Sequence, residues 1–426
     1  MIELHPWRGG FEAQLDVPGD KSLTHRALLF AALGRGDMVV DGWLDAADTR
    51  SSLAAARAFG AELLELSPDR VILRGQGHLS EPPEPIDCGN SGTTMRLAAG
   101  LAAGSSGLTV LYGDASLSRR PMARIVDPLR SLGLTVLSRA SGLAPVAVAG
   151  GAHRGGRFEL AVASAQVKSA LLLAALTAQG SVTVREPVLS RDHTERLLRA
   201  MGAHVAAGPE GVAVEPGPIN NIAIRVPGDP SSAAFWCAAA ALSDARSVTI
   251  RHMLFNPART GFFRLLEAMG CQVSWDQEGI VPEPYGAVTV RGGALSPFKL
   301  DAEDIPAMVD EVPLAALLAT QAGGISEIRG AHELRIKECD RIRVTTEILG
   351  AMGASIQEVS DGWIIAGPTA LKGAVANAHG DHRMAMLAAI AASIATGPSA
   401  ISDGDSVAIS YPQFFDTYAG LARLAG

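Results

Sequence analysis

The chain has 426 residues, enough for two domains of ordinary size or one large one. Hydrophobic residues make up 48% of it and charged residues 19%, which is typical of a globular protein with a large core. The formal net charge of −8 argues against a general nucleic-acid-binding surface. Any anion-binding site must therefore be local.

Cysteine usage and hydropathy predict a cytoplasmic protein. Residues 1–6 have neither the basic segment nor the apolar segment of a signal peptide. The Ala-rich apolar runs are only about 15 residues long and are interrupted by Gly, which is too short to span a bilayer. The four cysteines are widely spaced and match no metal-ligand pattern, which fits thiols in a reducing compartment. We expect no metal and no membrane partner.

The first predicted helix begins at Lys21, directly after a Gly-containing turn at residues 18–20. The unpaired N–H groups and the dipole at a helix N-terminus favour a bound anion. Lys21 and Arg26 add positive charge at this end, which a bound anion would offset. The alternative is an ordinary helix cap with solvated charges.

The same apolar helix is predicted six times. The copies cover residues 21–34, 91–104, 165–180, 231–243, 310–323 and 381–397. Most end at a Gly that can adopt the left-handed conformation after a helix. A short β-branched strand is predicted after each helix, at residues 38–40, 108–111, 181–184, 247–250, 325–328 and 399–401.

A second, more amphipathic helix follows each strand, so that the pattern repeats every 70 residues or so. These helices are predicted at residues 53–60, 126–133, 194–202, 262–270, 344–353 and 414–424. Their charged face predicts a surface position, whereas the first type is apolar nearly all round and must be enclosed. We therefore expect the first type to form a parallel bundle inside, with its N-terminal turns gathered at one end.

Six repeats divide naturally into two domains of three. The motif at residues 17–22 recurs in similar form at residues 226–232. If the chain crosses between domains at both, residues 20–228 form one continuous domain, and residues 1–19 with 229–426 form the other. The two crossings would act as a hinge beside an active-site cleft. A single boundary near residue 228 is the simpler alternative.

Cations recur at the starts of the apolar helices and in the adjacent loops, despite the acidic total. The set is Lys21, Arg26, Arg96, Arg120, Lys168, Arg191, Lys337, Arg341 and Arg383. Any one of them could belong to a surface ion pair. Their recurrence at equivalent places predicts ligands that carry several phosphate or carboxylate groups.

Acidic residues stand at two places among these cations. Asp310 and Glu311 open the fifth apolar helix, and Glu338 lies next to Lys337 and Arg341, which would share a face of a helical start. A carboxylate beside cations stays ionised at neutral pH and can accept a hydroxyl proton. The alternative is an ion-pair ladder on a solvated helix.

Two further features bear on the class of enzyme. His382 fits a capping or core histidine as well as a functional one. Neither common Gly-rich nucleotide motif is present, which argues against an ATP or NAD enzyme.

Taken together, eight motifs resemble one family closely, 5-enolpyruvylshikimate-3-phosphate synthase. They occur in the family's order at residues 18–26, 89–96, 118–121, 164–169, 190–195, 310–311, 335–341 and 380–386. The resemblance implies a two-domain inside-out α/β barrel of six repeats, with three repeats in each domain. Arg191 and Leu97 resemble the second of the family's two sequence classes.

The resemblance also implies the reaction and the residues that serve it. The enolpyruvyl group of phosphoenolpyruvate would move to the 5-hydroxyl of shikimate 3-phosphate, releasing phosphate through a tetrahedral intermediate. Carried over, the acid/base residues are Asp310, Glu338 and Lys21. The shikimate 3-phosphate contacts are Lys21, Ser22, Arg26, Ser164, Gln166, Ser190, Arg191, Asp310 and Lys337. The phosphoenolpyruvate contacts are Lys21, Gly92, Arg120, Gln166, Arg341 and Arg383.

The chain departs from the family pattern at several positions. Ala165 replaces the second serine of a Ser-Ser-Gln motif, and the lysine that many members carry before the C-terminal aromatic-Pro pair is replaced in residues 409–412. Gly92 is the small residue that the family associates with sensitivity to glyphosate, and we expect inhibition competitive with phosphoenolpyruvate. Leu97 stands where a proline often follows the second-motif arginine.

Other functions fit the sequence less well. UDP-N-acetylglucosamine enolpyruvyl transferases share the fold but usually carry a Cys in the loop that corresponds to residues 113–118, and this chain has none there. An RNA-cyclase-like protein is disfavoured by the acidic total. A catalytically silent anion-binding or interaction module remains the alternative from another class. We expect a monomeric enzyme without a cofactor or a nucleic-acid partner.

Overall fold

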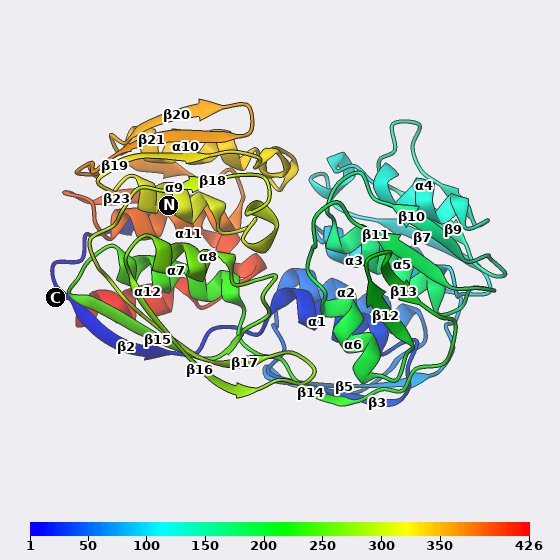
Figure 1. The fold of residues 1–426 in the computed structure, drawn as a ribbon. Coiled ribbons are helices and arrows are strands. Elements are labelled where there is room, and N and C mark those ends of the chain that lie inside the picture. Colours follow the sequence, from blue (N-terminus) through cyan, green and yellow to red (C-terminus); the bar gives the residue numbers. More distant parts are fainter. The chain divides into compact units, whose positions relative to one another are not determined.

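The computed structural model describes residues 1–426, which form two compact units. The first unit comprises residues 1–18, 227–280 and 284–426. The second unit comprises residues 19–226 and 281–283 (Figure 1). Each unit has its own hydrophobic core.

Three apolar helices lie at the centre of the second unit: α1 (Lys21–Phe30), α3 (Gly92–Ala102) and α5 (Ala165–Ala175). Helix α3 packs against both α1 and α5. Almost every residue beyond their first turns is buried, as expected for helices without a polar stripe. The more amphipathic helices of this unit are α2 (Ala47–Ala58), α4 (Ala123–Ser131) and α6 (His193–Ala200).

Three four-stranded sheets complete the second unit. The first sheet has the order β14 (Ala223–Arg225), β3 (Arg35–Asp41), β5 (Arg70–Gln76), β4 (Glu62–Leu66). The second has the order β6 (Ile86–Asp87), β7 (Leu108–Tyr112), β9 (Val146–Ala149), β8 (Thr135–Leu137). The third has the order β10 (Gly156–Glu159), β11 (Val182–Arg185), β13 (Gly211–Val214), β12 (Val205–Gly208). In each sheet a parallel pair is followed by two antiparallel strands.

The first unit repeats this plan. Its central helices are α7 (Pro230–Ala241), α9 (Val312–Ala319) and α11 (His382–Ala392), which pack against one another. The other helices are α8 (Gly261–Ala268), α10 (Arg341–Ala351) and α12 (Phe414–Leu424). Short 3₁₀ helices are η1 (Leu117–Arg119) in the second unit, and η2 (Ile305–Ala307), η3 (His332–Ile336) and η4 (Gly404–Ile409) in the first.

Two of the three sheets of the first unit have the same order of parallel and antiparallel strands. One is β2 (Phe11–Leu15), β15 (Arg246–Leu254), β17 (Tyr285–Arg291), β16 (Gln272–Gly279). The other is β18 (Lys299–Leu300), β19 (Gly324–Ile328), β21 (Gly362–Gly367), β20 (Ser355–Val359). These sheets lie on either side of the central helices in Figure 1.

The sixth sheet has only three strands: β22 (Val375–Asn377), β23 (Ser399–Ser402) and β1 (Ile2–Leu4). Strands β22 and β23 are parallel, and β1 pairs antiparallel with β23, with Ile2 opposite Ile401. The N-terminal strand thus takes the place that a hairpin strand has in the other five repeats.

The six predicted copies of the two helix types are confirmed, but the apolar helices end two to five residues before the predicted glycines. The predicted left-handed conformation is wrong for Gly34, Gly104, Gly180, Gly323 and Gly397. It occurs instead after the amphipathic helices, where φ lies between 90° and 105°, at Gly60, Gly133, Gly202, Gly270 and Gly353. At Gly34 close packing requires glycine, since a Cβ atom would lie 2.1 Å from Asn221 Oδ1.

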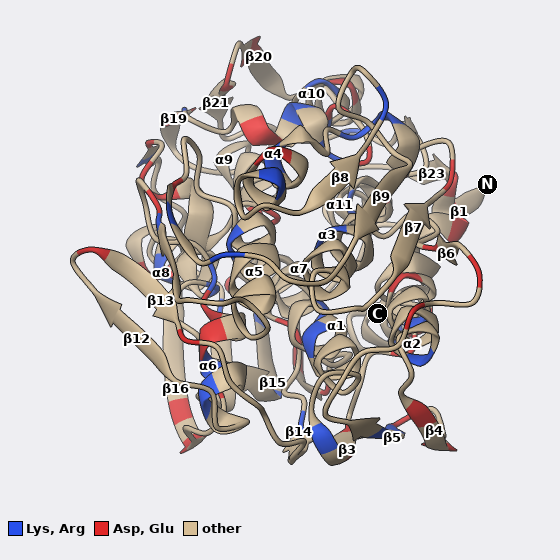
Figure 2. Cartoon of the chain, turned by 90° about the vertical axis from the view of Figure 1, so that its right-hand side faces the viewer, with Lys and Arg blue, Asp and Glu red and all other residues tan.

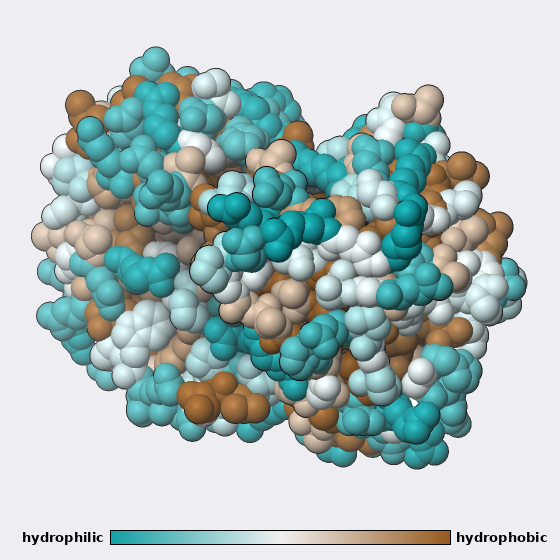
Figure 3. Space-filling view, turned by 45° about the vertical axis from the view of Figure 1, so that its right-hand side comes forward, coloured by the Kyte–Doolittle hydropathy of each residue, from teal (hydrophilic) through white to brown (hydrophobic).

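The exposed large hydrophobic side chains are spread over many elements. The face in Figure 3 is largely hydrophilic, with hydrophobic residues interspersed. A bilayer-spanning helix is absent, since the helices fall short in length or in hydropathy. The structure has no cluster of His, Cys, Asp or Glu arranged to hold a metal ion.

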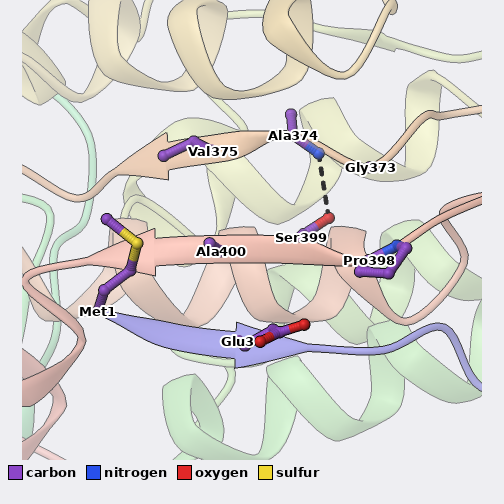
Figure 4. A pocket seen from close by; sticks show the side chains of 8 residues that line it. All are labelled: Met1, Glu3, Gly373, Ala374, Val375, Pro398, Ser399 and Ala400. Carbon is purple, nitrogen blue, oxygen red and sulfur yellow. Dashed lines mark hydrogen bonds between the residues drawn. The ribbon is translucent and has the colours of Figure 1, made fainter.

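An open pocket lies over the sixth sheet and is lined by residues at all three of its strands (Figure 4). Its lining is mostly apolar and includes Met1, Val375 and Ala400. The Ser399 hydroxyl in this lining accepts a hydrogen bond of 3.3 Å from the backbone N–H of Ala374. None of the predicted site residues lines this pocket.

Candidate active site

The start of α1 carries two of the predicted cations (Figure 2). The Asp20 carboxylate caps the helix by accepting a hydrogen bond of 2.7 Å from the backbone N–H of Leu23. Lys21 Nζ lies 2.5 Å from a carboxylate oxygen of Asp48, which belongs to α2. Asp48 therefore holds the Lys21 ammonium near the helix start. Because an ammonium group has three N–H donors, Lys21 can contact a bound anion at the same time.

Arg26 is 2% exposed and ties α1 to two other helices. Its guanidinium donates hydrogen bonds of 2.8 Å each to the hydroxyls of Thr194 and Ser169, and one of 2.9 Å to the Ser22 carbonyl. Burial lowers the pKa of Arg26 to about 10, against the opposing effect of Glu195. Arg26 therefore stays charged at neutral pH inside the unit.

Gln166, near the start of α5, joins the starts of α3 and α5. Its amide NH₂ donates to the Thr93 hydroxyl over 2.7 Å, and its carbonyl accepts from the Arg96 guanidinium. Arg96 also donates to the carbonyl of Pro121 over 3.3 Å. The first turns of α3 and α5 thus lie together, as the predicted parallel bundle requires.

Arg120 and Gly92 lie at the same end of α3. The Arg120 guanidinium donates a hydrogen bond of 2.5 Å to the side-chain carbonyl of Asn90. A Cβ atom on Gly92 would lie 2.9 Å from Arg96 Nη1 and 3.5 Å from Arg120 Nη1. Gly92 therefore leaves the space in which these two guanidinium groups sit.

Ser164, Ser190 and Arg191 come together around the N-terminal ends of α5 and α6. The Ser164 hydroxyl caps α5, and the Ser190 hydroxyl donates a hydrogen bond of 2.6 Å to Glu186. Arg191 Nη1 lies 3.4 Å from the Ser22 hydroxyl, so this group adjoins the start of α1.

Lys168, which belongs to the predicted set of cations, is buried and paired within the protein. Its side chain is 2% exposed, and its ammonium lies 2.7 Å from Glu186 and 2.8 Å from Glu195. Two buried carboxylates enclose this charge, because Lys168 lies one turn into α5 and faces the protein interior.

The first unit contains the other predicted site residues, gathered around Arg341. Arg341 is 1% exposed and contacts three carboxylates: Asp381 at 2.8 Å, Glu338 at 2.7 Å and Asp310 at 3.2 Å. Burial would lower the pKa of Arg341, but Asp381, Glu338 and Asp310 outweigh it and raise that pKa. Burial would likewise raise the pKa of Asp381, and the charge of Arg341 lowers it overall.

Asp310 has two further cations near it. Lys337 Nζ lies 3.5 Å from one carboxylate oxygen, and Arg383 Nη2 lies 3.9 Å from the other. The predicted helical start over residues 337–341 is wrong, since Lys337 is extended and α10 begins only at Arg341. The loop that replaces it still brings Lys337 and Glu338 to Arg341. Figure 2 shows the cations of α10.

The starts of α7 and α9 adjoin each other through a second buried group. The Ser231 hydroxyl donates a hydrogen bond to Glu311, and Arg259 donates to Ser231 over 3.0 Å and to Asp229 over 2.8 Å. Because Asp229 caps α7 and Glu311 precedes α9, the N-terminal turns of these helices point the same way. His382 is 2% exposed at the start of α11.

Sequence reasoning did not assign the residues that hold the cations in place, namely Asp48, Asn90, Glu186, Thr194 and Asp381. Asp381 and Thr194 lie inside motifs whose neighbours were assigned roles. Asn90 likewise lies inside the motif at residues 89–96. Asp48 and Glu186 come from segments outside the motifs, so no local pattern points to them.

The motif order and this geometry agree with the comparisons with known proteins. The family described as EPSP synthase (3-phosphoshikimate 1-carboxyvinyltransferase) matches residues 8–418. The chain belongs to the EPSP synthase family. A sequence of that enzyme name from Synechococcus sp. (strain RCC307) is 45% identical over 97% of this chain and 98% of its own length. One from Limosilactobacillus fermentum is 45% identical over 98% and 97%.

Solved structures of related proteins support the same family and fold. An EPSP synthase from Acinetobacter baumannii aligns with a TM-score of 0.88 and 35% identity, covering 99% of this chain and 97% of its own. The enolpyruvyl transferase NikO from Streptomyces tendae, 19% identical, has a TM-score of 0.77 over 98% and 96%, and supports the fold alone. The expected six-repeat enolpyruvyl transferase fold is confirmed.

The expected activity is also confirmed at the level of the family. The chain is a transferase of the shikimate pathway of aromatic amino-acid biosynthesis. It moves the enolpyruvyl group of phosphoenolpyruvate to the 5-hydroxyl of shikimate 3-phosphate and releases phosphate.

Proposed function

We propose that two clusters of residues bind these two substrates and perform the proton transfers. One cluster lies around the starts of α1, α3 and α5, and the other surrounds Arg341. The observation that carries the proposal is the group around Arg341, in which a buried guanidinium holds both Asp310 and Glu338. A carboxylate fixed against a buried cation is ionised and oriented, as a general base must be.

Shikimate 3-phosphate binding is assigned to residues of both clusters. The set is Lys21, Ser22, Arg26, Ser164, Gln166, Ser190, Arg191, Asp310 and Lys337. The proximity of Arg191, Ser22 and Ser190 supports this assignment, because hydroxyl and guanidinium donors at a helix N-terminus suit a phosphate.

Phosphoenolpyruvate is assigned to Lys21, Gly92, Arg120, Gln166, Arg341 and Arg383. The close approach of Arg96 and Arg120 to the Cβ position of Gly92 supports this assignment. Many family members carry a lysine before the C-terminal aromatic-Pro pair, but residues 409–412 of this chain contain no cation. Tyr411 in that segment is buried and accepts a hydrogen bond of 3.0 Å from Trp236 Nε1.

The chemistry explains why cations and carboxylates are both needed. A proton adds to the methylene carbon of phosphoenolpyruvate, and the 5-hydroxyl oxygen attacks C2 while its own proton passes to a base. The resulting tetrahedral intermediate then loses a methyl proton and the phosphate, which restores the double bond. Asp310 and Glu338 act as bases, and Lys21 or protonated Glu338 supplies the proton. Each such group typically contributes about 10²–10⁴-fold.

The arrangement of the whole chain is part of the proposal. We assign residues 20–228 to one domain and residues 1–19 with 229–426 to the other. The protein acts as a cytoplasmic monomer that binds no nucleic acid, which fits its acidic charge and its four unpaired thiols. Light scattering on the purified chain tests the monomer.

A coupled assay of phosphate release from both substrates tests the proposed roles. Asp310→Ala and Lys21→Ala should each lower kcat by at least about 10²-fold. Asp416→Ala and Lys299→Ala change exposed residues of the same types and should leave kcat unchanged. Full activity of Asp310→Ala would overturn its role as base. Substrate binding by the unaltered chain without phosphate release would instead indicate a silent binding protein.

A further inference from the structure

Glu186, which no sequence motif singled out, contacts four groups of the second unit. One carboxylate oxygen accepts from the Ser190 hydroxyl over 2.6 Å and from the backbone N–H of Ser164 over 3.1 Å. The other accepts from the backbone N–H of Ser190 over 3.3 Å and lies 2.7 Å from Lys168 Nζ. The side chain is 3% exposed. A single carboxylate therefore uses both oxygens, in a nearly dry environment, to hold two of the assigned serines.

These contacts join two separate elements. Glu186 follows β11, Ser164 caps α5, and Ser190 lies in the loop that leads to α6. The positions of Ser164 and Ser190 relative to each other therefore depend on the Glu186 carboxylate. Lys168 provides a second link, because its Nζ donates to the Ser190 carbonyl over 3.5 Å and its backbone N–H donates to the Ser164 carbonyl over 3.0 Å.

A buried carboxylate next to a phosphate site would repel the phosphate unless its charge is compensated. Lys168 supplies this compensation, since its ammonium lies between Glu186 and Glu195. Burial would lower the pKa of Lys168, but Glu195 and Glu186 outweigh burial and raise it, so Lys168 is charged at neutral pH. Burial raises the pKa of Glu195, and the charge of Lys168 opposes this shift.

We propose that Glu186 is a positioning residue for shikimate 3-phosphate, which fixes Ser164 and Ser190 for contact with that substrate, and that Lys168 neutralises it so that the phosphate is not repelled. The inference rests on the proposed function, because it requires these serines to contact shikimate 3-phosphate. It extends that proposal to two residues that do not touch the substrate themselves.

Steady-state kinetics of Glu186→Gln test the role. Glutamine has one acceptor oxygen and adds an NH₂ donor, so it cannot accept from all four neighbours. The KM for shikimate 3-phosphate should rise about tenfold, equivalent to the loss of roughly one hydrogen bond. The KM for phosphoenolpyruvate should stay within about twofold, since a general loss of structure would raise both. Glu210→Gln, an exposed partner of Arg157 in the same unit, is the matched control and should change neither.

The charge of Lys168 gives a second, independent test. Lys168→Met leaves both Glu186 and Glu195 buried and uncompensated, so the KM for shikimate 3-phosphate should rise further than in Glu186→Gln. The double variant Lys168→Met/Glu186→Gln keeps only the Glu195 carboxylate uncompensated, so its KM for shikimate 3-phosphate should lie below that of Lys168→Met. A double variant worse than Lys168→Met alone would overturn the neutralising role. Should either Lys168 variant fail to fold, Glu186→Asp, which keeps the charge but shortens its reach, must still raise the same KM.

Ser190→Ala separates this inference from the proposed function. If Ser190→Ala leaves the KM for shikimate 3-phosphate unchanged, the assigned binding site fails and the role of Glu186 fails with it. If Ser190→Ala raises that KM while Glu186→Gln does not, the binding site stands and only the positioning role is overturned. Equal rises in both KM values in Glu186→Gln would likewise overturn it.

Discussion

The charged side chains assigned to the site are already engaged with protein groups. Lys21 pairs with Asp48, Arg120 with Asn90, and Arg341 with three carboxylates. Such partners fix a long side chain in one geometry before a ligand arrives, which lowers the entropy lost on binding. Lysine and arginine have three and five donors, so a partner in the protein leaves donors for an anion.

Gly92→Ala should weaken phosphoenolpyruvate binding, since the new methyl group would displace the Arg96 guanidinium that lies 2.9 Å from its position. The KM for phosphoenolpyruvate should rise by about tenfold, or roughly 1.4 kcal/mol. Glyphosate should inhibit the unaltered chain competitively with phosphoenolpyruvate, and the substitution should weaken that inhibition. Gly217→Ala, where a Cβ atom meets nothing within 4 Å, is the control. Activity untouched by millimolar glyphosate would contradict the expectation.

His25, fully buried in α1, should make the protein less stable in mild acid. Burial lowers the pKa of His25 well below its usual value, and the charges of Lys21 and Arg26 lower it further. As the pH falls below about 6.5, the unfolded chain takes up a proton that the folded chain does not. The free energy of unfolding should therefore fall, by up to about 1.4 kcal/mol per pH unit for this group.

His25→Gln should remove that contribution while its amide still reaches the Ser52 hydroxyl, which lies 2.7 Å from His25 Nδ1. Denaturant unfolding at pH 7.5 and 5.5 measures the difference between the two pH values. The exposed His78→Gln serves as control. If His25→Gln and the unaltered chain lose equal stability over this interval, His25 is not the group responsible.

At the scale of elements, aspartates at helix starts have a double use. Asp229 and Asp381 each cap a central helix and also bind a buried arginine, Arg259 and Arg341 respectively. The cap satisfies backbone N–H groups, and the ion pair fixes the arginine beside the first turn. The same residue therefore determines both where the helix begins and where its neighbouring cation lies.

Asp381→Asn separates these two uses, since asparagine caps a helix as well as aspartate but carries no charge. The substitution should lower the free energy of unfolding by about 3–5 kcal/mol, as expected when a buried ion pair loses one partner. It should also raise the KM for phosphoenolpyruvate. Asp340→Asn changes the cap of α10, which is partly exposed, and should cost much less. Equal losses in urea unfolding of the two variants would contradict this assignment.

The elements could be predicted from sequence to different degrees. The apolar helices and the strands after them were predictable because their periodicity and their order recur six times. The strand before each apolar helix was not, since these six strands have only two to five residues each. Of the site residues, Lys21 and Arg341 were predictable from their place in the repeat. Their partners Asp48 and Asp381 were not, because only the tertiary packing brings them within reach.

At the scale of the whole molecule, the chain passes between the units more than twice. Residues 281–283 belong to the second unit, although the strands on either side of them, β16 and β17, belong to the first. Within this segment Glu283 is 1% exposed, and its carboxylate lies 2.7 Å from His193 Nδ1 and 3.5 Å from Arg196 Nε. No sequence pattern predicted that residues 281–283 belong to the second unit, because the sequence between the two strands is typical of an ordinary hairpin turn.

Glu283→Ala should destabilise the second unit, because it leaves His193 and Arg196 without this carboxylate. We expect the free energy of unfolding to fall by about 3–5 kcal/mol, as for a buried pair that loses one partner. Glu278→Ala removes the partly exposed partner of His252 in the same hairpin and should cost at most about 1 kcal/mol. Chemical unfolding followed by circular dichroism compares the two. Equal effects would show that burial of Glu283 adds nothing.

The pairing of β1 with β23 sets the order in which the chain can mature on the ribosome. Residues 19–226 can fold as they emerge, because all but three residues of their unit are contiguous. Strand β1 must instead wait for Ile401, the partner of Ile2. At about 5–20 residues per second this delay is about 20–80 s. Throughout that interval residues 2–4 have no partner strand, so the first unit completes its sixth sheet only after nearly all of the chain has been made.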